Sequence, residues 1–131
     1  MHISKEVDYG LRALIVIAKH PQDLLTSKEI AQQFEIPYNF LSLILPKLVR
    51  AGLIESVQGP KGGYRMAKLP KDISFLTVIQ ALEGELQLMD CNQVGLCKLD
   101  HFCSMAGIWQ QAKTHFEDYF ASVNLEQCLQ K

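Results

Sequence analysis

An amphipathic helical pattern that runs directly into a glycine-rich segment, within residues 37–66, constrains the fold more than any other part of the chain. Pro37 suits the first turn of a helix and Gly52 suits its end. Because Pro46 removes a backbone hydrogen bond, we expect a distortion inside this helix. One face is apolar at helical spacing: Phe40, Leu41, Ile44, Leu45, Leu48 and Val49. The other face is polar: Tyr38, Asn39, Ser42, Lys47 and Arg50.

The glycine-rich segment predicts a β-hairpin. Residues 53–57 and 64–67 favour two short strands, and residues 59–63 favour the turn between them. The remaining periodic segments predict helices, most of them behind a recognisable N-cap. These are residues 4–20 after Ser4, a short helix after the Thr26–Glu29 capping box, residues 74–84 after Ser74, residues 105–121, and a terminal turn after Asn124.

Length and composition indicate one soluble globular domain. The chain has 131 residues, 48% of them hydrophobic, with no apolar run of membrane-spanning length and no signal-peptide pattern. We therefore expect a cytoplasmic protein with reduced cysteines and no membrane partner. The expected organisation is a compact N-terminal unit in residues 1–83, a cysteine-containing loop in 84–104, and a long helix with its C-terminal turn in 105–131.

The net charge of −1 conceals an uneven distribution. Residues 1–75 carry ten Lys and Arg against seven Asp and Glu, whereas residues 76–131 carry three against seven. Residues 47–71 hold six basic side chains and one acid. This local excess could face an anionic partner, or it could be an ordinary solvated surface.

The order of the predicted elements is that of a winged helix-turn-helix: a mainly α fold with a small β-hairpin wing and a long C-terminal helix. Such a domain holds its recognition helix by an apolar face and presents a polar face to the major groove. A flexible, cationic wing suits a phosphate backbone. The predicted contacts to double-stranded operator DNA are Tyr38, Asn39, Ser42, Lys47, Arg50, Lys61, Gly62, Gly63 and Arg65.

Three cysteines at six-residue intervals, Cys91, Cys97 and Cys103, predict a metal or cluster site. A step of six residues turns a helix by about 240° and extends a strand by roughly 20 Å, so only an irregular loop could gather these thiols. Thiolates ligate iron–sulfur clusters, and three leave one ligand to be found. Zinc usually prefers more closely spaced cysteine pairs, although it stays an alternative. Cys128 lies between Leu125 and Leu129 and fits core packing better.

Four segments together resemble the Rrf-two family of bacterial transcriptional regulators: "DYGLRALIVIA", "RAGLIESVQGPKGGYRMAK", "ISFLTVIQALEG" and the three-cysteine stretch. The resemblance spans nearly the whole chain. It implies a homodimer held by the long C-terminal helix and bound to a palindromic operator. It also implies an iron–sulfur cluster of 4Fe–4S or 2Fe–2S type, since iron–sulfur members carry three cysteines in the corresponding loop.

The resemblance also bears on the fourth ligand. The cluster-assembly branch of the family uses a histidine three residues after the last cysteine, where this chain has Ala106. The nitric-oxide-sensitive branch uses an aspartate from the first helix of the partner subunit, and Asp8 matches that position. Asp8 could instead form an i,i+4 ion pair with Arg12. His101 is the main rival ligand, and Glu6 and Glu85 are weaker ones.

The expected function is therefore a cluster-dependent transcriptional repressor that senses nitric oxide, redox state or cluster supply. A cluster-free thiol-redox or zinc-binding regulator is the alternative. A cysteine-dependent enzyme is disfavoured, because no pocket-forming motif surrounds His101 and Cys103. A protein–protein adaptor without DNA binding also stays open.

Overall fold

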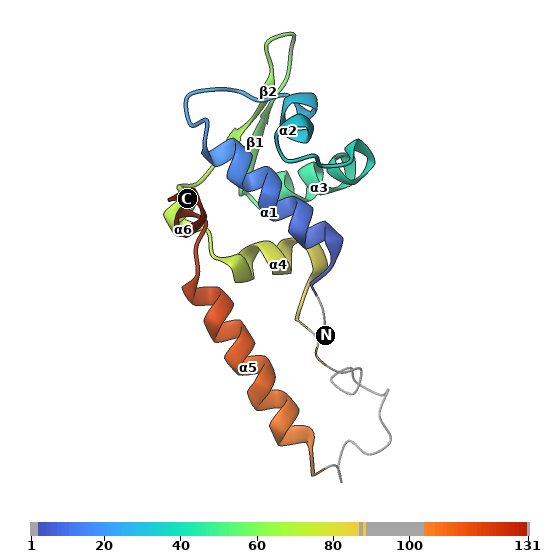
Figure 1. The fold of residues 1–131 in the computed structure, drawn as a ribbon, viewed down its shortest axis with the longest axis vertical. Coiled ribbons are helices and arrows are strands. Elements are labelled where there is room, and N and C mark those ends of the chain that lie inside the picture. The colour runs from blue at the N-terminus through green and yellow to red at the C-terminus, as the bar shows by residue number, and fades with distance from the viewer. Residues whose placement is uncertain (1–2, 87, 89–103, 131) are drawn as a thin grey trace.

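The computed structural model describes residues 3–86, 88 and 104–130. Figure 1 shows a body of short helices with a β-hairpin at one end and a long helix extending from the other. The elements are α1 (Lys5–Ala18), α2 (Ser27–Gln33), α3 (Tyr38–Arg50), β1 (Ile54–Val57), β2 (Gly63–Met66), the 3₁₀ turn η1 (Pro70–Asp72), α4 (Phe75–Glu83), α5 (Ala106–Ser122) and α6 (Glu126–Leu129). This confirms the mainly helical fold with a hairpin wing.

Local capping chemistry sets where several of these helices begin. Ser4, Thr26 and Ser74 each accept a hydrogen bond from the backbone amide three residues on. Thr26 also donates its hydroxyl proton to the Glu29 carboxylate, which completes the predicted side-chain pair. Asn124 accepts from the Gln127 amide and so opens the last turn. The predicted starts are therefore confirmed to within one or two residues.

The tight turn between α2 and α3 places the two helices as a helix-turn-helix. Glu35 adopts a left-handed backbone conformation with φ of 51°, and the Ile36 amide donates to the Ala31 carbonyl at 3.0 Å. Pro37 lies at the N-cap, one position earlier than expected. Pro46 does not end α3, which continues to Arg50 with the exposed proline ring inside it.

The core lies where α1 meets α3 and α4. Leu14 and Ile17 of α1, Leu41 and Leu48 of α3, and Ile79 of α4 have almost no exposed surface. Gly10 allows α1 and α4 to approach closely, because a Cβ atom there would lie 2.4 Å from Leu82 Cδ1. α1 also contacts α2, β2 and α6, so it is the central element of the body.

The wing is an antiparallel pair in which Ile54 faces Met66 and Val57 faces Gly63. It is fixed to the body through Leu25, which exchanges two backbone hydrogen bonds with Tyr64 at 2.8 and 3.0 Å. At the other end, backbone bonds from Phe75 to Val123 and from Leu125 to Ile73 attach the end of α5 to the body. Among the described helices, none is long and apolar enough to cross a membrane.

Substituting Gly63 should destabilise the wing. Its φ is 156°, and a Cβ atom would lie 2.7 Å from the Leu25 carbonyl oxygen, which is backbone and cannot move aside. We expect Gly63→Ala to lower the free energy of unfolding by about 2 kcal/mol in urea titrations.

Gly107→Ala is the matched control, because no described atom lies within 4 Å of a Cβ there. The free energy of unfolding of that variant should be unchanged, or higher by up to about 1 kcal/mol because alanine favours a helix more than glycine does. Equal stability of the two variants would contradict the close contact between β2 and Leu25.

Candidate nucleic-acid interface and metal-ligand residues

The outward face of α3 gathers most of the polar residues predicted to contact DNA. Tyr38, Asn39, Ser42 and Arg50 are all exposed, while the opposite face is buried against α1 and α4. The Ser42 hydroxyl donates to the Asn39 carbonyl at 2.9 Å, so its remaining hydrogen-bonding capacity is as an acceptor. The Asn39 side-chain amide forms no hydrogen bond with the part of the chain that the structure describes. This face is a helix surface suited to hydrogen bonding with base edges.

Leu43 also lies on this face, and the sequence patterns did not single it out. Its side chain is 64% exposed, although leucine would ordinarily be assigned to the core. The available signal was its helical position, about 40° from Asn39 and about 160° from the buried Leu41 at 100° per residue.

The wing supplies one exposed cation at its tip and one that is paired across the strands. Lys61 is exposed and forms no ion pair with any described residue. Arg65 Nε donates to Glu55 Oε2 at 2.9 Å, and both side chains are about half exposed. Gly62 has a structural role beside its predicted DNA contact, because a Cβ atom there would lie 2.1 Å from the Val57 carbonyl oxygen. Gly63 is close to the Leu25 backbone in the same way.

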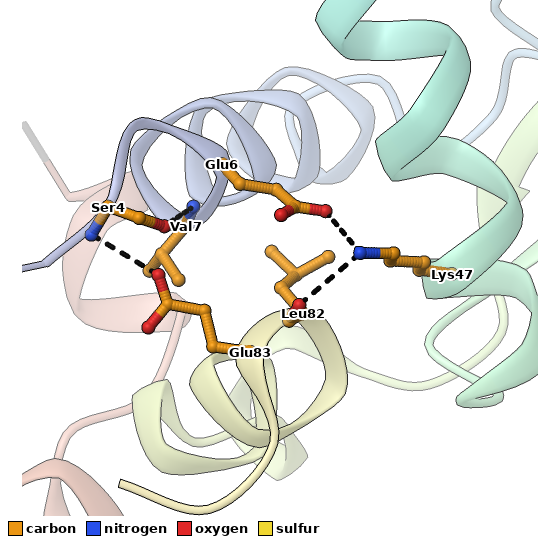
Figure 2. Close-up of polar contacts among 6 residues, drawn as sticks. All are labelled: Ser4, Glu6, Val7, Lys47, Leu82 and Glu83. Carbon is orange, nitrogen blue, oxygen red and sulfur yellow. Dashed lines mark hydrogen bonds and ion pairs between the residues drawn. The ribbon is translucent and has the colours of Figure 1, made fainter. Parts of the chain in front are cut away.

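Lys47 does not share the outward polar face to which the sequence pattern assigned it. Its ammonium donates to Glu6 Oε1 of α1 at 2.6 Å and to the Leu82 carbonyl of α4 at 3.4 Å, as Figure 2 shows. The physical reason is that Lys47 lies at the edge of the face, about 80° from Asn39, within reach of a carboxylate and of an unpaired carbonyl at a helix end. The pattern identified the helix face correctly but could not anticipate partners on other helices.

A second contact closes the same junction between α1 and α4. The Ser4 amide donates to Glu83 Oε1 at 3.3 Å, while the Ser4 hydroxyl accepts from the Val7 amide at 3.3 Å (Figure 2). Glu83 is thus at the positive N-terminal end of α1, and Lys47 is at the negative C-terminal end of α4. Both charges complement the helix dipoles.

Asp8 lies on the outer surface of α1 and forms the local ion pair that the sequence allowed. Its carboxylate is 2.9 Å from the Arg12 guanidinium, with the Asp8 side chain 52% exposed. Arg12 also donates to the Phe34 carbonyl and lies over the Tyr9 ring, so the arginine has partners of its own.

Of the other predicted ligands, the two glutamates are described by the structure, and both are paired with lysines. Glu6 is bonded to Lys47 and only 28% exposed, and Glu85 is paired with the nearly buried Lys113. Cys91, Cys97, Cys103 and His101 lie outside the described residues. Within the described ranges, no group of three or more His, Cys, Asp or Glu side chains is arranged to hold a metal ion. Cys128 is a free, half-buried thiol in α6.

Removing the Lys47 ammonium should weaken the junction measurably. We expect Lys47→Met to lower the free energy of unfolding by about 1 kcal/mol, because it removes a charge-assisted bond that is only partly exposed to water. Urea unfolding measures the effect, with Lys28→Met in the exposed first turn of α2 as the control.

A double-mutant cycle with Glu6→Gln isolates the pair from other effects of each substitution. The double variant should be more stable than the sum of the two single losses implies. Strict additivity would mean that Glu6 and Lys47 do not interact in solution.

Comparison with known proteins agrees with this architecture. The model of the Rrf2 family, described as an iron-dependent transcriptional regulator, matches residues 3–131. The transcriptional regulator NsrR of Halalkalibacterium halodurans is 34% identical over 119 residues, which cover 88% of this chain and 82% of that protein.

Two solved structures share the fold over nearly the whole chain. The structure of T. potens IscR superposes with a TM-score of 0.79 at 27% identity, covering 99% of this chain and 87% of that one. The oxidised form of Staphylococcus aureus CymR has the same TM-score and identity, covering 100% and 98%. Since a family model spans almost the entire sequence, the protein is a transcriptional regulator rather than an enzyme, and it belongs to the Rrf2 family.

Proposed function

We propose that this protein is an iron–sulfur-dependent repressor that binds operator DNA as a homodimer. The observation that carries the proposal is the combination of three evenly spaced cysteines with the exposed carboxylate of Asp8 on the helix that supports α3. The description of the matched family, an iron-dependent transcriptional regulator, also supports this proposal.

The DNA contacts proposed are those that the fold leaves available. Asn39 and Ser42 would read base edges from the first turns of α3, with Tyr38 beside them. Arg50 and Lys61 would contact phosphates, and Arg65 would join them by exchanging its half-exposed pair with Glu55 for a phosphate. Gly62 and Gly63 would shape the wing. Lys47 is omitted from this set, because Glu6 and the Leu82 carbonyl occupy its ammonium.

The proposed dimer rests on α5. Figure 1 shows that this helix extends away from the body, and Ile108, Phe116 and Tyr119 expose 62%, 41% and 63% of their surface. Large apolar side chains in such number on one helix are typical of an interaction surface. A second copy of α5 would cover them, in line with the dimer that the family resemblance implies.

Of the two candidate carboxylates on α1, Asp8 is the one that the protein could give up to iron at lower cost. Its ion pair with Arg12 is exposed, and exposed pairs of this kind contribute only about 0–1 kcal/mol. Glu6 is less accessible and bonded at 2.6 Å within the junction, so using it as a ligand would open the contact between α1 and α3. A carboxylate ligand from one subunit and three thiolates from the other would complete a four-ligand site across the dimer.

The proposed mechanism depends on two residues of α1, Asp8 and Glu6. A bound iron–sulfur cluster would supply a redox-active centre that nitric oxide or oxygen can attack, most readily at a weak carboxylate ligand. Asp8 would tie α1 of one subunit to the cysteine segment of its partner. Because Glu6 and Lys47 join α1 to α3, releasing Asp8 would alter how the two recognition helices are spaced, and half-site spacing governs affinity.

A second candidate is a cluster-free regulator that uses thiol oxidation or zinc. The similarity to the oxidised form of S. aureus CymR, at 27% identity over the whole chain, favours keeping it. Native mass spectrometry separates the two, since a cluster, a zinc ion and a disulfide change the mass differently.

The decisive experiment is anaerobic purification of the wild type and of Asp8→Ala. We expect visible absorbance with iron and sulfide in the wild type, and a lost or oxygen-labile cluster in the variant, because one ligand is missing. Asp23→Ala is the control, since Asp23 is an exposed aspartate that also faces a side chain on its own segment, His20. Circular dichroism should show that all three proteins fold.

Colourless wild-type protein without iron and sulfide, even after reconstitution, would refute the cluster. A variant with a normal cluster would refute Asp8 and move the assignment to His101.

DNA binding has its own test in the salt dependence of affinity. We expect Arg50→Ala to weaken binding to DNA selected in vitro and to reduce the slope of log affinity against log salt by about one, as for one lost phosphate contact. Fluorescence anisotropy between 50 and 200 mM salt measures both quantities.

Lys71→Ala, in the exposed turn η1, serves as the charge-matched control and should keep the wild-type slope. If no DNA binds with a salt-dependent affinity in any cluster state, an adaptor function becomes the better proposal.

A further inference from the structure

The exposed leucine at the centre of the α3 outer face needs an explanation that the polar contacts do not give. Leu43 is 64% exposed, whereas Leu41, Ile44 and Leu48 of the same helix are fully buried. It therefore contributes little to the core of the domain. An isolated exposed leucine is unremarkable on most surfaces, but this one lies among the residues proposed to enter the major groove.

Its position on the helix is central to that face. At 100° per residue, Leu43 lies about 40° from Asn39 and about 20° from Arg50, and it belongs to the first two turns of α3. The N-terminal residues of a recognition helix are the ones that meet base edges. Any approach that brings Asn39 to a base therefore brings Leu43 to the same or the next base pair.

The chemistry of a leucine selects one feature of the major groove. Thymine alone presents an apolar group there, its 5-methyl, whereas the edges of guanine, cytosine and adenine present donors and acceptors. A leucine against those edges would desolvate polar groups without replacing their hydrogen bonds. Against a methyl group it removes apolar surface from water at both sides of the contact.

We propose that Leu43 is a specificity-determining residue that reads the 5-methyl group of one thymine in each operator half-site. This inference rests on the proposed DNA-binding function and adds the base that the helix selects. The discrimination would operate partly by exclusion, because the other bases leave unpaired polar groups beneath the leucine.

The test uses the full-length protein, purified anaerobically, and DNA that it selects from a random duplex library. Each thymine of the selected site is replaced in turn by deoxyuridine, which lacks only the methyl group. We expect about a fourfold weaker affinity at one thymine per half-site, the effect of one buried carbon. Leu43→Ala should bind the parent site more weakly and lose this penalty, while Leu43→Met should retain it.

Leu69→Ala is the matched control, because Leu69 is similarly exposed but lies in the loop before η1, away from α3. It should keep the wild-type uridine profile. Because both leucines are exposed, we expect each variant to fold, and circular dichroism would verify this.

The outcomes separate this inference from the proposed function. If the library yields no bound DNA, the proposed DNA-binding function fails. If DNA is bound but no thymine is methyl-sensitive, or Leu43→Ala keeps the wild-type profile, the reading by Leu43 is overturned. Unchanged affinity of Leu43→Ala for the parent site would likewise overturn it.

Discussion

The ion pair between Lys47 and Glu6 joins three helices at one point beside the apolar core, and the proposed signalling route depends on this contact. Lys47 comes from α3, Glu6 from α1, and the carbonyl that shares the ammonium belongs to Leu82 of α4. The junction is possible only because α1 and α4 approach closely. Gly10 provides that closeness, since a side chain there would occupy the space of the Leu82 methyl group. Gly10 thus lets α1 and α4 approach, and Lys47 of α3 forms hydrogen bonds with both of these helices.

Two segments of the chain start beside this junction. The segment after α4 begins at Gly84 and leads through the buried Leu86 toward the cysteines, while the N-terminus of α1 is attached to Glu83 by the Ser4 amide. Within each subunit, the helix that carries Asp8 and the segment that leads to the cysteines therefore both start beside this three-helix contact.

The sequence predicted the elements well because helix starts, turns and periodicity are local. Ser4, Thr26 and Ser74 cap helices through residues three positions away, and the hairpin follows from glycines within a few residues. Prediction failed where a partner lies far along the chain. Nothing near Lys47 indicates a carboxylate 41 residues earlier, and the apolar character of Leu43 hides an exposure that only the helical wheel reveals. The assignment of the cluster ligands stays a prediction, since the cysteines lie outside the described residues and Asp8 would act across a dimer.

In the proposed mechanism, the two carboxylates of α1 have different tasks: Asp8 would bind the cluster, and Glu6 would connect the helix to α3. Glu6 and Asp8 are two residues apart, which rotates their side chains by about 200° and places them on nearly opposite faces. Glu6 faces inward and is bonded to Lys47, while Asp8 faces outward and is held only by an exposed pair. Binding of Asp8 to the cluster would break only an exposed ion pair. It would nevertheless constrain the position of α1, whose Glu6 is bonded to Lys47 of the recognition helix. Exchanging the two roles would fail, because a ligand taken from the inner face would break the connection it is meant to use.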